Sequence, residues 1–214
     1  DVEIDYITIS GSGEPTLNSG IGKLILNIKQ MTEIPVAVIT NGSLLHDLQV
    51  RQDIINADLI VPSLDAGDEE TFREINCPNA LIHFDLMVEG LIALSNEFDG
   101  RIWLEVFFCA GINDSDQQVR KISDIISRIN PDKVQLNTSV RPTASGRAEA
   151  VTPQRLEQIA EMIGPKAEVI ASFDKAAVAQ GEQVEPSTIL DMLKRRPCSA
   201  EEIAESVGLI LDKV

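Results

Sequence analysis

The feature that most constrains the fold is an alternation between short apolar runs and segments with helical spacing. The apolar runs occupy residues 4–9, 34–39, 58–61, 101–108 and 133–137. The intervening segments are amphipathic, and one shows the i, i+3, i+4, i+7 spacing of a helix face in Val119, Ile122, Ile125, Ile126 and Ile129. This alternation predicts βα units on a parallel sheet, which is an α/β fold.

Polar side chains follow or lie within these runs. They are Glu14, Asn41, Ser63, Asp65 and Asn137. Because the carboxyl ends of parallel strands meet at one edge of a sheet, we expect these side chains to share that edge. Ligands bind at this edge in folds of this class.

The first apolar run ends in Ser-Gly-Ser-Gly-Glu-Pro, residues 10–15. Gly11 and Gly13 allow close approach of a ligand to the backbone and positive φ. Glu14 supplies a carboxylate that can hold an ammonium group, and Pro15 restricts the turn. A plain strand-to-helix turn is the alternative interpretation of this loop.

The order of Gly-Ser-Gly-Glu-Pro, Thr-Asn-Gly (40–42), Ser-Leu-Asp-Ala (63–66) and the run that contains Glu105 resembles the radical S-adenosylmethionine (radical SAM) superfamily. Within it, the chain is most similar to the iron–sulfur oxidoreductases that include the wyosine-synthesis tRNA enzyme, and it shares Gly-Glu-Pro with glycyl-radical activating enzymes. The resemblance covers about residues 2–144. It implies a partial (βα) barrel and reductive cleavage of S-adenosylmethionine to a 5′-deoxyadenosyl radical, which abstracts hydrogen from an unknown substrate.

The resemblance also implies cofactor contacts. Residues Gly11, Gly13, Glu14 and Pro15 would form the loop that contacts the methionyl amino group of S-adenosylmethionine. Asn41 would bond its carboxylate or ribose, or serve as a turn residue. Ser63 and Asp65 would contact the ribose hydroxyls or the carboxylate, although Asp65 could instead cap the helix that contains Glu69 and Glu70. Glu105 is expected to face the ligand cavity rather than the outer helices, and Asn137 completes the set.

Radical SAM enzymes hold a [4Fe–4S] cluster with three closely spaced cysteines. The cysteines of this chain are Cys77, Cys109 and Cys198, which lie too far apart for such a loop, so we expect no metal ligands among them. The resemblance places the cluster ligands upstream of Asp1. The chain by itself would then be inactive, either because that loop belongs to the whole protein or because the chain is a genuine truncation.

The net charge of −16 disfavours binding to phosphate backbones or to anionic membranes. No run of apolar residues is long enough to span a bilayer, and unspaced cysteines favour a reducing cytoplasm. The negative charge therefore disfavours nucleic acid as a partner. Another α/β enzyme with phosphate or sugar ligands is also disfavoured, because the chain contains no P-loop motif.

The sequence pattern changes after Asn137, where residues 138–148 are rich in small and polar residues and indicate a long loop. We expect a barrel over residues 1–148, a helix and linker over 149–185, and a small helical appendage over 186–214. Thr152 and Pro153 mark a helix start in the middle segment. In the last segment, Ser199 and Glu202 have capping-box spacing, and the whole resembles the start of a winged-helix or helix-turn-helix module. It could bind a protein partner, so a non-catalytic regulator is the alternative function.

Overall fold

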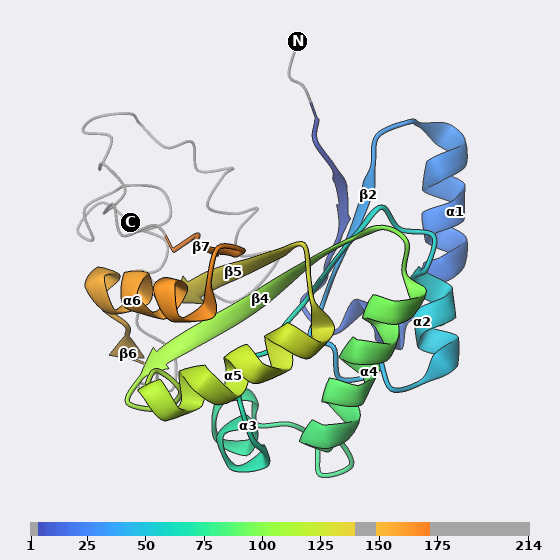
Figure 1. The fold of residues 1–214 in the computed structure, drawn as a ribbon. Coiled ribbons are helices and arrows are strands. Elements are labelled where there is room, and N and C mark those ends of the chain that lie inside the picture. The colour runs from blue at the N-terminus through green and yellow to red at the C-terminus, as the bar shows by residue number, and fades with distance from the viewer. Residues whose placement is uncertain (1–3, 140–148, 172–214) are drawn as a thin grey trace, which may run out of the picture. The chain divides into compact units, whose positions relative to one another are not determined.

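The computed structural model describes residues 4–139 and 149–171, and within them a parallel sheet has the strand order β1-β2-β3-β4-β5-β7 (Figure 1). A further strand, β6, pairs antiparallel with the end of β4. The five expected strands are all present and parallel, and a sixth parallel strand, β7, pairs with β5. The strands are β1 (Ile7–Ile9), β2 (Val36–Thr40), β3 (Leu59–Pro62), β4 (Arg101–Ala110), β5 (Lys133–Thr138), β6 (Glu149–Ala150) and β7 (Ala167–Val169).

The helices connect successive parallel strands and lie on one face of the sheet (Figure 1). This arrangement confirms the α/β class with a parallel sheet. Thr152 caps α6 and Pro153 opens it, as the sequence predicts. The helices are α1 (Ile21–Met31), α2 (Leu48–Ile54), α3 (Glu69–Asn76), α4 (Phe84–Glu97), α5 (Asp116–Ile129) and α6 (Pro153–Ile163), with a short 3-10 helix, η1, at Pro15–Leu17.

Burial alternates along β4 and β5 because only one face of the sheet packs against these helices, whereas every residue of β3 is buried. In β4, Leu104, Val106 and Phe108 are fully buried, whereas Glu105 and Phe107 are partly exposed. The buried residues join side chains from all the α-helices in one core. We call the opposite side of the sheet the open face.

A second, smaller apolar cluster lies on the open face. It contains Ala37, Leu59 and Val61, with Tyr6 and Trp103 packed against it. The Tyr6 and Trp103 rings meet edge to face, and Lys133 Nζ lies 4.8 Å from the centre of the Trp103 ring. This cluster covers part of the open face of β2, β3 and β4.

The ladder between β3 and β4 is short. Backbone pairing covers Leu59 with Arg101 and Ile60 with Ile102, and then gives way to a single bridge between Ser63 and Glu105. Pro62 lies at the gap. Leu64, two residues later, donates its N–H to Glu105, so the alternation would direct an N–H of residue 62 toward β4, and proline has none. We call this gap the β3–β4 seam.

All the described residues belong to one compact unit, Asp1–Ala171. The expected helix-turn-helix-like segment over 186–214 lies outside the described residues. Within those that the structure describes, no helix is long and apolar enough to cross a membrane.

Gly90 in α4 yields a test of this packing. A Cβ at position 90 would overlap the backbone of Leu45 and His46, in the loop that follows β2. Helix propensity alone predicts that Gly90→Ala stabilises the protein by about 1 kcal/mol. We expect the opposite, a loss of about 1–3 kcal/mol in the free energy of unfolding measured in urea, because the overlap involves backbone that cannot move aside.

The exposed neighbour Glu89 provides the control, since Glu89→Ala changes the same helix without touching that loop. Stabilisation by both substitutions would show that α4 does not pack against the loop as described.

Candidate functional site

The loops that follow β1 to β5 lie along the carboxyl edge of the sheet, which we call the rim. The expected site residues lie in these loops or near the carboxyl ends of the strands: Gly11, Gly13, Glu14, Pro15, Asn41, Ser63, Asp65, Glu105 and Asn137. Hydrogen bonds join them into two groups. Glu14 contacts Asn41 on one side, and Glu105 contacts Asn137 on the other.

Glu14 joins the loop after β1 to the end of β2. Its Oε1 accepts hydrogen bonds from Thr16 N (3.1 Å), Thr16 Oγ1 (2.6 Å) and Thr40 Oγ1 (2.6 Å), and its Oε2 accepts one from Asn41 N (2.7 Å). Glu14 therefore braces the rim. A carboxylate has about four acceptor sites shared by its oxygens, so Oε2 can accept a further donor.

The glycine loop differs from expectation in one respect. Gly11 and Gly13 are exposed, but neither has positive φ, so that prediction is wrong. Gly42 has a φ of 74° instead, directly after Asn41. The left-handed residue that shapes this part of the rim thus lies in the loop after β2, where the chain turns away from the sheet.

Asn41 has the turn role that was one of its two interpretations. Its Oδ1 accepts a hydrogen bond from Ser43 N at 2.9 Å, and its own N–H is held by Glu14. The side-chain oxygen of Asn41 is therefore occupied, and its side-chain NH₂ group is left available to a ligand.

Four side chains form a polar row across the open face. Ser63, Glu105, Gln135 and Glu168 are neighbours in the register of β3, β4, β5 and β7, and the paired residues of parallel strands share a face. Glu105 Oε1 accepts from Asn137 Nδ2 at 3.1 Å, and Glu168 accepts from Gln135 at 3.0 Å. Within the described residues, the Ser63 hydroxyl and Glu105 Oε2 have no hydrogen-bond partner. We call this set the polar row.

Asp65 occupies the β3–β4 seam. Its Oδ1 accepts from Phe107 N at 2.9 Å, and its Oδ2 accepts from Asn76 Nδ2 at 2.7 Å. The interpretation of Asp65 as a helix cap is wrong, because Asp68 caps α3 and accepts from Thr71 N. Desolvation of its carboxyl group raises the pKa of Asp65 to about 6, and the nearby charge of Glu105 acts in the same direction.

Asn113 is a site-supporting residue that sequence reasoning missed. It is fully buried, donates to the carbonyl oxygens of Asp65 and Phe107 at 2.7 Å each, and accepts from Cys109 N at 2.7 Å. Asn113 thereby closes the seam beyond Asp65. Its position in an Asn-Asp-Ser stretch is typical of a turn, so the sequence carried no signal of burial.

The described residues contain no group of three or more side chains suited to hold a metal ion. Cys109 is buried, and burial raises the pKa of its thiol, whereas Cys77 is exposed. His46 precedes α2, and His83 lies at the N-cap of α4 rather than inside the helix. None of these side chains reaches the polar row through a hydrogen bond.

A groove of about 400 Å³ lies on the helical side, between α4 and α5. Val88 and Ile125 line it together with charged residues of both signs, and none of the expected site residues contributes to it. The groove is therefore separate from the rim.

The position of Asp65 makes stability depend on pH. Its folded pKa of about 6 lies above the ordinary value of 3.8, so the folded protein binds this proton more tightly than the unfolded chain. This contribution to stability is complete at low pH and is lost as the pH rises through about 6. Asp65→Asn removes it while the side-chain carbonyl can still accept from Phe107 N.

We expect the free energy of unfolding of the wild type, relative to Asp65→Asn, to fall by about 1–2 kcal/mol between about pH 5 and pH 7.5. Urea titrations at several pH values measure this difference, and other carboxylates cancel in it. The exposed Asp5→Asn variant is the control. A difference that does not change with pH would contradict the assignment to Asp65.

Sequence comparison finds relatives along most of the chain, although no family model matches it. A protein of Brachyspira hyodysenteriae named GTPase Obg is 42% identical over 206 residues, which cover 95% of this chain and 30% of that protein. A UPF0026 protein of Methanocaldococcus jannaschii is 32% identical over 95% of this chain and 64% of its own length. A probable GTP 3′,8-cyclase of Saccharolobus islandicus is 35% identical over 42% of this chain and 28% of that protein. The chain thus spans less than two thirds of each of these relatives.

Solved structures share the fold at low sequence identity. A domain of pyruvate-formate lyase-activating enzyme from Bacteroides vulgatus matches 76% of this chain and 97% of its own, with a TM-score of 0.62 and 16% identity. A radical SAM methyltransferase from Sphaerobacter thermophilus matches 79% of this chain and 51% of its own, with a TM-score of 0.60 and 19% identity. Streptococcus suis SuiB bound to S-adenosylmethionine matches 86% of this chain and 43% of its own, with a TM-score of 0.61 and 14% identity. This chain therefore has the radical SAM-like partial-barrel fold, and its sequence is related to the UPF0026 proteins and distantly to GTP 3′,8-cyclase.

Proposed function

We propose that this chain is the core of a radical SAM enzyme and that it binds S-adenosylmethionine between the rim and the polar row. The observation that carries the proposal is the pair formed by the Ser63 hydroxyl and Glu105 Oε2. Both lie on the open face near the carboxyl edge of a radical SAM-like sheet, and neither has a hydrogen-bond partner within the described residues. Both groups are accessible to solvent, since no buried side-chain polar atom of the described residues lacks a partner, and both are therefore free to bond a ligand there.

The residues present fit S-adenosylmethionine. Glu14 Oε2 can accept from the methionyl ammonium group, next to the exposed backbone of Gly11 and Gly13. The amide donor of Asn41 suits the ligand carboxylate. Ser63 and Glu105 suit the vicinal hydroxyls of the ribose, since a carboxylate accepts from two donors. In this arrangement Pro15 restricts the loop, and Asp65 supports the site through the seam rather than through a free carboxylate oxygen.

A [4Fe–4S] cluster is the second cofactor of the proposal. The described residues provide no ligand set for it, and the proposal assigns its cysteine ligands to the whole protein. The cluster would supply the electron that cleaves S-adenosylmethionine. The residues of this chain bind and orient the methionyl and ribose groups and limit the access of water to the open face.

A non-catalytic regulator that binds a protein partner is the other candidate function. It rests on residues 186–214, which lie outside the described part of the chain, and no described contact favours it. The name of the GTPase Obg relative adds no support for nucleotide hydrolysis here, because this chain covers 30% of that protein and lacks a P-loop motif.

The proposed function is tested on the full-length protein with a reconstituted cluster and a chemical reductant. We expect 5′-deoxyadenosine to form from S-adenosylmethionine, as measured by chromatography. Ser63→Ala should raise the KM for S-adenosylmethionine roughly tenfold without changing the free energy of unfolding, because the hydroxyl bonds the ligand and no protein group.

Serine 127 provides the matched control, since Ser127→Ala removes a hydroxyl that bonds within α5 on the helical side. Equal KM values for the two alanine variants would remove Ser63 from the site. Absence of 5′-deoxyadenosine despite an intact cluster spectrum would overturn the proposed activity.

Glu14 has a bracing role and a proposed binding role, and one substitution tests both. The amide nitrogen of Glu14→Gln cannot accept from Asn41 N or from an ammonium group. We expect a loss of about 1–3 kcal/mol in stability and a roughly tenfold or greater loss of affinity for S-adenosylmethionine, measured by calorimetry on the reconstituted protein.

The control is Thr16→Val, which removes one hydrogen bond to Glu14 Oε1 and leaves the carboxylate charged. It should lower stability by about 1 kcal/mol and leave affinity unchanged. If Glu14→Gln lowers stability alone, Glu14 is a brace and does not hold the ligand.

A further inference from the structure

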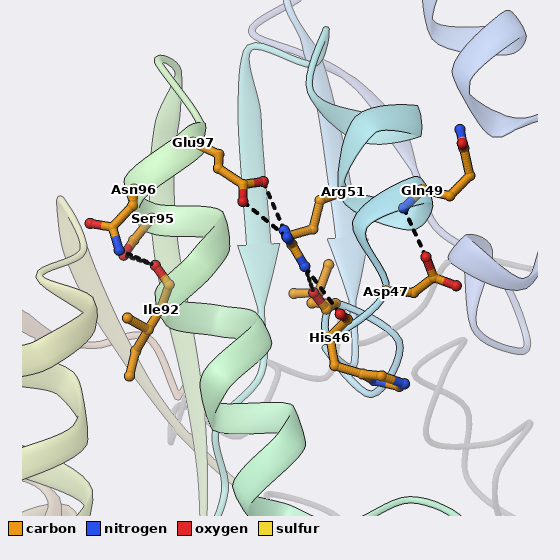
Figure 2. Close-up of polar contacts among 9 residues, drawn as sticks. His46, Asp47, Gln49, Arg51, Ile92, Ser95, Asn96 and Glu97 are labelled. Carbon is orange, nitrogen blue, oxygen red and sulfur yellow. Dashed lines mark hydrogen bonds and ion pairs between the residues drawn. The ribbon is translucent and has the colours of Figure 1, made fainter.

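Arg51 is the one charged residue that is buried among those that the structure describes, with 8% of its surface exposed. It lies in α2, one turn after the loop that joins β2 to this helix. Figure 2 shows its guanidinium between that loop and α4. Nε and Nη2 donate to the two carboxylate oxygens of Glu97 at 2.8 and 2.9 Å, a bidentate pair.

The remaining donors of Arg51 hold the loop. Nη1 donates to the carbonyl oxygen of Leu45 at 2.7 Å and to that of His46 at 3.3 Å. The hydrogen bonds to Glu97 raise the pKa of Arg51, and those from Arg51 lower the pKa of Glu97, so both groups stay charged. The geometry is specific to arginine, because lysine cannot form the bidentate pair and bond two carbonyls.

The same loop is fixed at its other end by Glu14, which holds Thr40 Oγ1 and Asn41 N. Short backbone bonds connect the two ends. Leu45 N donates to Gly42 O at 3.1 Å, and Ser43 N donates to Asn41 Oδ1 at 2.9 Å. A shift of the Leu45 carbonyl therefore passes to Asn41 through a stiff turn, with α4 packed against it at Gly90.

We propose that Arg51, held by Glu97, is a positioning residue for the rim. It fixes the loop of residues 41–47 so that the backbone N–H of Asn41 donates to Glu14 and the side chain of Asn41 faces the ligand. The part of this inference that concerns ligand affinity rests on the proposed function. Arg51 itself touches no ligand. Its effect passes through Asn41.

The chain offers a matched control in Arg73. This residue also bonds a carboxylate, that of Glu69 at 2.6 Å, and two backbone carbonyls, those of Asn79 and Ile82. Those carbonyls belong to the connection between α3 and α4, not to the loop after β2. Arg73→Met therefore removes three bonds of the same kinds, against four for Arg51→Met, and leaves the Asn41–Glu14 contact in place.

The experiment compares Arg51→Met with Arg73→Met in the full-length protein, under conditions where both variants are folded by circular dichroism. Hydrogen exchange of the Asn41 amide, read by mass spectrometry or NMR, requires no cofactor. We expect Arg51→Met to accelerate it roughly tenfold or more and Arg73→Met to leave it unchanged, because only the first releases the loop. Arg51→Lys, which cannot restore the bidentate pair, should resemble Arg51→Met.

A double-mutant cycle measures the coupling between Arg51 and Asn41 in ligand binding, which a purely structural role of Arg51 would not produce. Arg51→Met should weaken binding of S-adenosylmethionine roughly tenfold in the wild-type background and have little further effect on top of Asn41→Ala, since coupled residues are not additive. Additive effects, or wild-type exchange at Asn41, would overturn the proposal. If the wild type binds no S-adenosylmethionine while Arg51→Met still accelerates exchange at Asn41, the proposed function fails and the positioning of Asn41 by Arg51 stands.

Discussion

Packing of one face of the parallel sheet against the helices is the constraint on which the rest of the structure depends. Alternate residues of each strand enter that core, so the residues between them must face the other way. In β4, Leu104, Val106 and Phe108 are fully buried, so Glu105 must lie on the opposite, open face. A slip of one residue would bury Glu105 and expose three large apolar side chains. The polar row is thus a consequence of apolar packing on the opposite side.

Much of this could be predicted from the sequence, because the apolar periodicity that signals strands and helices is the same periodicity that packs them. The strands β1 to β5 and the helices α1, α4, α5 and α6 follow from it. The two-residue strand β6 does not, since Glu149 and Ala150 carry no pattern. The first strand is also shorter than its apolar run, because Ile4 is exposed. The sequence pattern therefore predicted the type and order of the elements better than it predicted where each element begins and ends.

The candidate site was predictable in place but not in detail. A carboxylate after a strand indicates the carboxyl edge of the sheet, and Glu14 and Asp65 are there. What each oxygen bonds depends on residues distant in sequence: Glu14 on Thr40 and Asn41, and Asp65 on Asn76 and Phe107. Such contacts leave no local pattern. The same holds for Arg51, whose partner Glu97 is 46 residues away and whose role no helical spacing reveals.

The β3–β4 seam has a consequence for how the open face can change. Elsewhere in the sheet, backbone ladders set the spacing between strands, and substitutions cannot alter it. Beyond Pro62 a single backbone hydrogen bond, from Leu64 N to Glu105 O, joins the two strands, and the other bonds come from side chains, chiefly the carboxylate of Asp65 and the amide of Asn113. Side chains can be exchanged one at a time, whereas a ladder cannot. The seam is therefore the part of the sheet where single substitutions can change the distance between two strands while the rest of the sheet stays the same.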